Sequence, residues 1–546
     1  MNRKSGTLGH AKKEALVFGA SPKRRRFRMI IPAYPAFNIY SRAARKTTAL
    51  GPVCVATAVG ELGGWDVEVI DENNLRRYGP KGEAGGADHA FLQQARPADI
   101  AGFYGGLTST IPRLYRIARF YKEQGAVTVA GGHHFTAETI PEALGSGIDY
   151  AVIGEGEEAI QELLRAFEKG SEVSGIRGIA YRDQGRVIFT PPREPIADFD
   201  RLPMPNFSLV RYAKIKTYPV ERIRGCAMTC EFCAVSGRPR CAPVERQMEN
   251  IRLLVETQGA KKFFVVDDLF GQQRDETLRF CRLLKEYQSS IGKRLWFMVQ
   301  IRLDKAKDPQ LLSAMYDAGV RVVAIGYETP IEEELIAMNK RIRPDEMVSM
   351  TRTYHRFGFL VHGMFIFGYP AQDEEKFQMA AAERMKRFKA FIKKSKLDTI
   401  QVLLPIPLPG TRLRQRLQTQ NRIYETEDVG WEYYDGNFPL FEPDAPMKVE
   451  EMQEAIRKIM GMIYQSKNVL LGVLDIFAFP SLLFFLHDLQ SGWRGWFHSW
   501  RNHWMRFGGW LTVQKWSNQF KKDNFNDKLK RAREHTQARE LSKGPL

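Results

Sequence analysis

The chain has 546 residues, of which 44% are hydrophobic and 26% charged, a balance that excludes a disordered, collagenous or disulfide-stapled protein. The 81 lysines and arginines exceed the 63 acidic residues, and the net charge is +18. Residues 1–26 hold eight basic residues against one acidic residue, and residues 487–546 hold twelve against five. The nearly neutral middle argues against a nucleic-acid partner, whereas the basic ends favour contact with an anionic surface.

Residues 1–26 lack the continuous apolar core of a signal peptide, so we expect a basic, flexible tail. Residues 27–170 alternate short apolar runs with segments of helical periodicity, which predicts a doubly wound parallel sheet. The expected strands are Arg28–Pro32, Val67–Asp71, Ile100–Tyr104, Val127–Ala130 and Tyr150–Ile153, with helices over 51–62 and 111–124. Ligands of such sheets bind beyond the carboxyl ends of the strands. The residues at those ends are Thr108, Ser109, Gly131, Gly132, Gly154 and Gly156.

Residues 171–219 are predicted to form a connector, with a β-hairpin over 178–190 and a proline-rich extended segment after it. Residues 220–415 repeat the strand–helix alternation, which predicts a parallel βα array, either an open barrel or a doubly wound sheet. Its expected strands are Val220–Arg224, Lys262–Val266, Trp296–Ile301, Val320–Gly326, Gly363–Phe367 and Thr399–Leu404. Strand signals stop after residue 415, so we expect a mostly helical region over 416–546.

Three of the six cysteines, Cys226, Cys230 and Cys233, fall within eight positions directly after a predicted strand. Three thiolates on a four-iron cube leave one iron open for a substrate or cofactor, unlike the four-ligand clusters of electron-transfer proteins. The alternative is a structural zinc site with Cys241 as the fourth ligand. The spacing favours iron–sulfur, because zinc ligands usually come as two separate cysteine pairs.

This cysteine spacing, with Phe232 before the last cysteine, resembles that of the radical S-adenosylmethionine (SAM) enzymes. Motifs at later strand ends agree with the cobalamin-binding subgroup of that family: Asp267-Asp268-Leu-Phe270, Ile325-Gly-Tyr-Glu328, Met338-Asn-Lys340, Phe367-Gly-Tyr-Pro370 and Pro407-Leu-Pro-Gly410-Thr411. Earlier segments match the same subgroup in order: Ala98-Asp99, Leu107-Thr-Ser109-Thr110, Ala130-Gly-Gly-His133, Ile153-Gly-Glu-Gly-Glu157 and Asp200-Arg-Leu-Pro203. The resemblance covers residues 27–415.

The resemblance implies an N-terminal Rossmann-like cobalamin-binding domain, a partial (βα)₆ radical SAM barrel, and three cofactors: a [4Fe-4S] cluster, SAM and cobalamin. Cys226, Cys230 and Cys233 would then ligate the cluster. Phe232, Asp267, Arg302 and Glu328 are the candidate SAM contacts, and Thr108, Ser109, Gly131, Gly132, Gly154 and Gly156 the candidate cobalamin contacts. Many cobalamin proteins carry an Asp-x-His-x-x-Gly loop, but residues 32–38 read Pro-Ala-Tyr-Pro-Ala-Phe-Asn. Because His133 and His134 follow a different strand, we expect no protein histidine on cobalt.

The resemblance also implies reductive cleavage of SAM to a 5′-deoxyadenosyl radical, with an electron supplied by a donor such as flavodoxin or ferredoxin. C-methylation of a small hydrophobic substrate is our first interpretation. The alternatives are cobalamin-dependent ring formation or oxidation of a porphyrin- or lipid-like substrate, and a non-enzymatic, zinc-stabilised cobalamin-binding protein.

The C-terminal region contains two apolar features. Val469–Leu486 is close to the lower length of a membrane span but contains Asp475 and Pro480, so we expect a buried or interfacial helix pair. Trp493, Trp496, Trp500 and Trp504 share one helix face, flanked by arginines. This helix either packs on the barrel or lies on an anionic membrane, and the second possibility would place a cytoplasmic protein at the inner face of a membrane.

Overall fold

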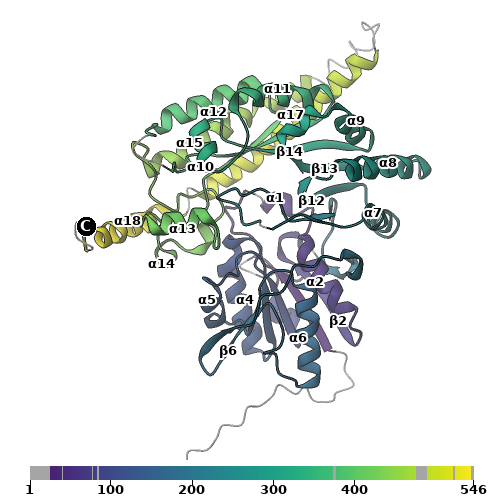
Figure 1. Ribbon diagram of the computed structural model, residues 1–546, viewed down its shortest axis with the longest axis vertical. Coiled ribbons are helices and arrows are strands. Elements are labelled where there is room, and N and C mark those ends of the chain that lie inside the picture. The colour runs from purple at the N-terminus through teal and green to yellow at the C-terminus, as the bar shows by residue number, and fades with distance from the viewer. Residues whose placement is uncertain are drawn as a thin grey trace, which may run out of the picture.

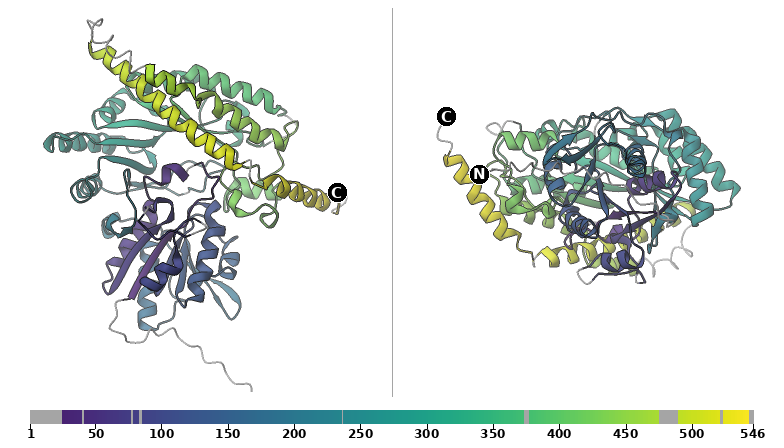
Figure 2. Two further views of the ribbon diagram at one scale, coloured as in Figure 1. Left: turned by 180° about the vertical axis from the view of Figure 1, so that it is seen from behind. Right: turned by 90° about the horizontal axis from the view of Figure 1, so that it is seen from below.

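The computed structural model shows two α/β domains, one above the other, with helical C-terminal elements spanning both (Figure 1). It describes residues 25–39, 41–76, 78–82, 85–235, 237–372, 377–474, 489–520 and 523–542. The N-terminal domain, in purple and blue, lies below the teal and green barrel, and the yellow helix α17 (Leu489–Phe520) crosses the barrel from behind (Figure 2).

The N-terminal domain is built on a sheet in which the described residues form eight strands, in the order β7-β6-β5-β4-β3-β1-β2-β8. The strands are β1 (Arg25–Ile31), β2 (Trp65–Asp71), β3 (Ile100–Tyr104), β4 (Val127–Gly131), β5 (Tyr150–Val152), β6 (Ile179–Asp183), β7 (Arg186–Phe189) and β8 (Val210–Arg211). β1 to β5 and β8 pair in parallel. The covering helices are α2 (Leu50–Gly60), α3 (His89–Ala95), α4 (Ile111–Glu123), α5 (Ile140–Gly145) and α6 (Glu157–Lys169). The predicted doubly wound fold is confirmed.

The segment 171–219, predicted as a connector, contributes β6, β7 and β8 to this sheet. The hairpin β6–β7 forms as expected, but it adds to β5 in antiparallel orientation. β8 then pairs with β2 at the opposite edge. Because both edge strands come from this segment, it covers the two otherwise open edges of the parallel sheet.

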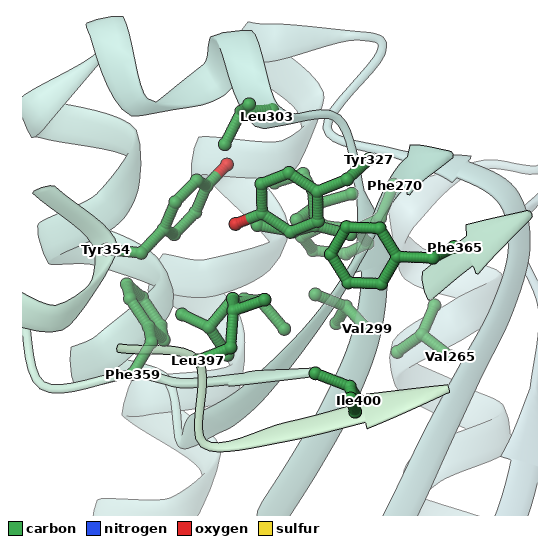
Figure 3. Packing of buried hydrophobic residues seen from close by; sticks show 14 of the residues in the cluster. Val265, Phe270, Val299, Leu303, Tyr327, Tyr354, Phe359, Phe365, Leu397 and Ile400 are labelled. Carbon is green, nitrogen blue, oxygen red and sulfur yellow. The ribbon is translucent and has the colours of Figure 1, made fainter. Parts of the chain in front are cut away.

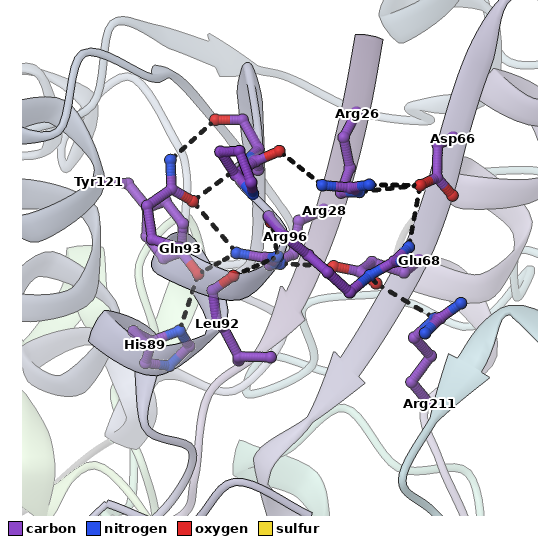
Figure 4. Close-up of polar contacts among 12 residues, drawn as sticks. Arg26, Arg28, Asp66, Glu68, His89, Leu92, Gln93, Arg96, Tyr121 and Arg211 are labelled. Atoms are coloured by element: carbon purple, nitrogen blue, oxygen red, sulfur yellow. Dashed lines mark hydrogen bonds and ion pairs between the residues drawn. The ribbon is translucent and has the colours of Figure 1, made fainter. Parts of the chain in front are cut away.

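A buried arginine organises the amino-terminal half of this sheet (Figure 4). Arg28 on β1 is fully buried, and its Nε lies 2.7 Å from Glu68 Oε1 on β2. Its guanidinium also donates to Tyr121 Oη at 2.9 Å and to the Leu92 carbonyl at 3.2 Å. Arg96 and Arg211 contact the other oxygen of Glu68, each at 3.1 Å. The buried charge is therefore paired and hydrogen-bonded, which is the condition for burying it at acceptable cost.

The second domain is a curved, open parallel sheet in which the described residues form six strands, in the order β16-β15-β14-β13-β12-β9. They are β9 (Tyr218–Val220), β12 (Lys262–Phe270), β13 (Trp296–Ile301), β14 (Val320–Glu328), β15 (Leu360–Ile366) and β16 (Thr399–Leu403). The outer helices are α7 (Val244–Gln258), α8 (Arg274–Ser290), α9 (Pro309–Asp317), α10 (Glu332–Ala337), α11 (Pro344–Arg356) and α12 (Ala381–Ser395). Of the two predicted arrangements, the partial barrel is the one that forms. The first predicted strand is split, because Ile223–Arg224 leaves the sheet as β10 and pairs with β11 (Arg240–Cys241).

Alternation of side chains along β12 separates the apolar core of the barrel from a cavity. Val265, Val299 and Phe365 point into the apolar layer beneath the outer helices, with Tyr327 and Tyr354 (Figure 3). The intervening residues of β12 (Phe264, Val266 and Asp268) face the opposite side and line a cavity. Because side chains alternate along a strand, the Asp268 carboxylate faces the cavity and the N-terminal domain.

The C-terminal region joins the two domains through α13 (Arg412–Thr419), α14 (Thr426–Val429), α15 (Val449–Ile463) and α18 (Phe525–Ser542), confirming its helical character. α15 packs on α12 and β16, whereas α18 packs on α14. The 3₁₀ turn η6 (Trp431–Tyr433) reaches the N-terminal domain, where the Tyr433 and Phe37 rings stack with centroids 5.4 Å apart. Eleven buried residues of this region belong to one hydrophobic cluster with the core of the N-terminal domain, so the region holds the two domains together.

Helix α17 lies on the barrel by a face that includes polar residues. Asn502 Nδ2 donates to Asp398 Oδ1 at 3.0 Å, and Arg506 donates to the carbonyls of Leu397 and Asp398, both at 3.0 Å. Trp516, further along this face, is 3% exposed, whereas Trp504 is 36% exposed. The side chains of Trp493 and Trp496 lie outside the described residues, as does most of 469–486. Among the described helices, none is long and apolar enough to cross a bilayer.

Candidate functional site

A cavity of about 840 Å³ lies between the carboxyl ends of the N-terminal strands and the barrel. The predicted glycines Gly131, Gly132, Gly154 and Gly156 all line it. Gly225, Ala234, Val235 and Asp268 line its barrel side, close to the cysteine loop. The glycines predicted to bind cobalamin therefore line this cavity, and the segment that carries the cysteines borders it through Gly225, Ala234 and Val235. The predicted cluster ligands and SAM contacts lie outside the lining.

Two of the glycines cannot be replaced without strain. Gly132 has φ +127°, and a Cβ built there would lie 2.6 Å from the Gly105 carbonyl carbon. Gly154 has φ +86°, where side chains are rarely tolerated. The backbone of both strand ends is thus bare toward the cavity, which suits a broad, flat ligand such as cobalamin.

Thr108 and Ser109 occupy a different place from the glycines. Both are buried in the 3₁₀ turn η2 (Thr108–Thr110), which packs against η6 and does not line the cavity. His134 is also buried outside the lining, with its ring 4.8 Å from that of Trp431. Burial and the nearby Arg414 lower the pKa of His134 to about 3. His133, by contrast, lines the cavity.

The cysteine loop is closed at its base by the short antiparallel pair β10–β11. Gly225 precedes the first cysteine with φ +91°, and its N–H donates to Asp268 Oδ2 at 2.6 Å. Burial raises the pKa of Cys230, and the negative charges of Glu328 and the Cys226 thiolate act in the same direction. Each thiolate of a four-iron cube binds a different iron, so the three sulfurs need not meet at one point.

The described residues contain no group of three His, Cys, Asp or Glu side chains arranged around a single metal ion. Cys241 belongs to β11, where it pairs with Ile223 of β10 and lies outside the segment that carries the other three cysteines. This arrangement does not support the alternative of a four-ligand zinc site.

Glu231 anchors the middle of the cysteine loop to the barrel. Its carboxylate accepts hydrogen bonds from Arg416 Nε at 2.7 Å, Arg416 Nη2 at 2.9 Å and Tyr369 Oη at 2.6 Å. The neighbouring Phe232 ring packs against Tyr369, with centroids 6.1 Å apart. Glu231 N–H also donates to the Met338 carbonyl at 3.1 Å. The loop is thus held by the motif residues Tyr369 and Met338, a role that the sequence patterns alone did not reveal.

The three polar residues predicted to contact SAM have different environments. Asp267 is buried and accepts from the N–H groups of Arg222 at 2.6 Å and Ile223 at 3.0 Å, so its carboxylate holds the backbone before the loop. Burial raises the pKa of Asp267 to about 6. Arg302 pairs with Asp304 at 2.7 Å and donates to the Met228 sulfur at 3.1 Å, which places it beside the loop.

Glu328 ends β14 with φ +61°, a conformation that is uncommon for a non-glycine residue. Its Oε1 lies 2.5 Å from Lys340 Nζ. Burial alone would lower the pKa of Lys340, but Glu328 and the thiolates of Cys230 and Cys233 raise it above its usual value. Lys340 therefore stays protonated beside the cysteine loop. Lys340 and Asp268 both belong to the site, although the sequence patterns did not single out either residue as a contact.

Comparison with known protein families decides between an iron–sulfur and a zinc function for the cysteine loop. Residues 40–164 match the B12 binding domain family, and residues 220–383 match the Radical SAM superfamily. The chain is a cobalamin-binding radical SAM protein. Its cofactors are therefore a [4Fe-4S] cluster, SAM and cobalamin.

Several curated proteins are related to this radical SAM protein. It is 29% identical to an uncharacterised methyltransferase from Pyrococcus horikoshii, over 69% of this chain and 81% of the relative. It is 25% identical to the anaerobic magnesium-protoporphyrin IX monomethyl ester cyclase of Rubrivivax gelatinosus, over 62% of each chain. It is 26% identical to the hopanoid C-2 methylase of Rhodopseudomonas palustris, over 51% of this chain and 50% of the relative.

Two solved structures share the fold. The radical SAM methyltransferase TsrM from Kitasatospora setae, with cobalamin and a [4Fe-4S] cluster bound, has a TM-score of 0.60 at 18% identity, covering 88% of this chain and all of that one. The cobalamin-dependent enzyme OxsB, with aqua-cobalamin and SAM bound, has a TM-score of 0.62 at 14% identity, covering 94% and 84%. At these identities the likeness concerns the fold.

Proposed function

We propose that this cobalamin-dependent radical SAM enzyme methylates an unactivated carbon of a small hydrophobic substrate. When bound, the cluster and SAM supply a hydrogen-abstracting radical, and cobalamin supplies the methyl group. The observation that carries the proposal is the shared cavity, which the cysteine loop and the bare glycine edge both border. A substrate held there could be reached from both sides without leaving the site.

In this proposal Cys226, Cys230 and Cys233 hold the cluster, and Gly131, Gly132, Gly154 and Gly156 receive the corrin. Glu328 with Lys340, and Arg302, lie beside the loop and are positioned to bind SAM. Asp267 acts indirectly, since its carboxylate already accepts two backbone hydrogen bonds. The apolar side chains Phe264, Val266 and Val235 on the cavity wall favour a hydrophobic substrate and exclude water from the reacting atoms.

The cluster assignment is tested by anaerobic reconstitution. The wild type should bind about four irons and cleave SAM reductively. Cys226→Ala, Cys230→Ala and Cys233→Ala should each abolish both properties, whereas the control Cys241→Ala should retain them. Loss of metal in Cys241→Ala, with zinc in the native protein, would refute the assignment.

The cobalamin assignment is tested by electron paramagnetic resonance of the Co(II) state. We expect no superhyperfine splitting from a protein nitrogen, because residues 32–38 contain no histidine and His134 lies outside the cavity lining. His133 does line the cavity, so His133→Ala is the decisive variant. A nitrogen splitting in the wild type that disappears in this variant would place His133 on cobalt.

The cyclase among the relatives favours a second candidate, ring formation or oxidation of a porphyrin- or lipid-like substrate. The two candidates differ in the fate of the SAM methyl group. An anaerobic reaction with methyl-deuterated SAM should give a product that carries a CD₃ group if methylation is correct. A product that lacks deuterium and has lost hydrogen would favour cyclisation.

We also propose that the protein is cytoplasmic and receives its electron from flavodoxin or ferredoxin. We further propose that it binds peripherally to an anionic membrane. The support for membrane binding is an exposed apolar group: Leu470 is 61%, Leu474 51% and Trp504 36% exposed. A Cβ built on Gly472 would lie 3.3 Å from Trp504 Nε1, so the segment that carries the two leucines passes beside Trp504. Vesicle flotation should show binding to anionic but not neutral vesicles, and binding should be lost in Leu470→Ser/Trp504→Ala. Absence of flotation by the wild type would refute this location.

A further inference from the structure

Two arginines at the base of the cysteine loop contact one turn of the cobalamin-binding domain. Arg224 on β10 and Arg240 on β11 are directly paired across the antiparallel ribbon that closes the loop. Arg224 Nη1 lies 3.0 Å from Glu155 Oε1, and its Nη2 lies 2.8 Å from Glu157 Oε1. Arg240 Nη1 lies 2.9 Å from Glu155 Oε2, and its Nη2 lies 3.1 Å from Oε1 of the same carboxylate. One glutamate thus binds both strands at the base of the loop.

The network is shielded from solvent. The side chains of Arg224 and Glu157 are 15% and 6% exposed, and those of Arg240 and Glu155 are 23% and 18% exposed. Ion pairs in such settings are screened by salt much less than surface pairs. Burial alone would raise the pKa of Glu155, but hydrogen bonds from Arg240 and from the Ile196 N–H lower it below its usual value. Glu155 is therefore charged at neutral pH.

Further groups fix the two guanidinium groups in place. Arg224 Nε lies 2.7 Å from Oε2 of Glu221, a residue between β9 and β10. The Phe199 ring lies beneath both arginines, 5.3 Å from Arg224 Cζ and 5.9 Å from Arg240 Cζ. Ile196 N–H donates to Glu155 Oε2 at 2.6 Å. The segment that joins the two domains therefore takes part in the same contact.

This network also forms a wall of the shared cavity, which Glu155, Glu157, Glu221, Arg224 and Arg240 all line. It lies between the cysteine loop and the glycine edge, since Gly154 and Gly156 alternate with the two glutamates. Movement of the loop relative to the N-terminal domain would have to break these contacts. The network is thus placed to control the separation between the two cofactors.

We propose that Glu155 and Glu157 are positioning residues that lock the base of the cysteine loop to the cobalamin-binding domain and so set the distance between the SAM and cobalamin sites. The proposal depends on the two-domain family assignment and not on methyl transfer. Breaking the lock should leave each cofactor site intact while loosening their mutual placement.

Hydrogen–deuterium exchange on the full, reconstituted chain tests the lock without a substrate. In Glu155→Gln we expect the amides of residues 222–241 to exchange about tenfold faster, because a charge-assisted hydrogen bond at the base of the loop is lost. Exchange in β13 to β15 should not change, and iron content and cobalamin affinity should stay at the wild-type level. Arg240→Met removes the same contact from the barrel side and should give the same local pattern, and Arg240→Lys should restore it in part.

The matched control is Glu158→Gln, in the first turn of α6, which begins two residues after Glu155. Glu158 pairs with Arg193 at 3.2 Å and does not contact the barrel through this pair, so exchange over 222–241 should match the wild type. Unchanged exchange over 222–241 in both Glu155→Gln and Arg240→Met would overturn the proposal. So would an equal increase throughout the barrel, which would indicate a general loss of stability. Failure to find a methylated product would refute the proposed function but leave this result unaffected.

Discussion

Replacing Glu231 tests how the protein retains its cluster. The side chain is 11% exposed and accepts three hydrogen bonds, two from Arg416 and one from Tyr369. Glu231→Gln keeps the shape and one acceptor oxygen, but it removes the negative charge and leaves the Arg416 guanidinium without its counter-charge. Hydrogen bonds to charged groups contribute about 1.5–3 kcal/mol each, so we expect the loop to lose about 3 kcal/mol. That loss raises the population of the opened loop roughly a hundredfold.

The assay is the rate at which a chelator bleaches the reconstituted cluster, measured together with the free energy of unfolding. Glu231→Gln should bleach much faster than the wild type. The matched control is Glu138→Gln, because Glu138 pairs with Arg414 on the same helix as Arg416, with Nε 2.7 Å from Oε1, but does not contact the loop. Bleaching in the control should match the wild type. Equal rates in Glu231→Gln and the wild type would refute the idea that this carboxylate secures the loop.

Three further predictions concern buried charges and helix packing. Burial raises the pKa of Asp267 in the folded state from 3.8 to about 6, so the free energy of unfolding should fall by up to ~3 kcal/mol as pH rises between these values. Asp267→Asn should abolish this pH dependence in urea titrations performed at different pH. A rise in stability over that range would contradict the assignment. Arg28→Met should lower the free energy of unfolding in urea by about 3–5 kcal/mol, because the buried Glu68 carboxylate loses one of its positive partners. A loss below about 1 kcal/mol would show that Arg96 and Arg211 are enough to neutralise Glu68. Trp516→Ala should cost about 3–5 kcal/mol while Trp504→Ala costs far less, and equal melting temperatures would contradict the packing of α17.

The local features of both domains could be predicted from the sequence. Strand and helix alternation follows from the spacing of apolar residues, so the parallel strands and the order of the domains were predicted correctly. Glycines at strand ends, such as Gly132 and Gly154, reached the cavity because parallel strands end at one edge of a sheet. Thr108 and Ser109 also follow the end of a parallel strand in the sequence, but in the structure η6 packs against their turn and they do not line the cavity. That cover comes from a segment more than 300 residues away, which no local pattern reports.

The sequence by itself determined the chemistry that the chain can carry, because the three cysteines of one loop are close in sequence and their spacing sets what they can bind. Only the tertiary structure decided which charges support that loop. Glu155 and Arg224 are 69 residues apart, and Glu231 and Arg416 are 185 residues apart, so each pair meets only after both domains and α13 have packed. The same holds for α17. Helical periodicity identifies its faces, but the carbonyls of Leu397 and Asp398 at the barrel surface decide that the face carrying Asn502 and Arg506 turns inward. Side-chain pairs of large sequence separation depend on the complete fold, since their energy is gained only when distant segments come together.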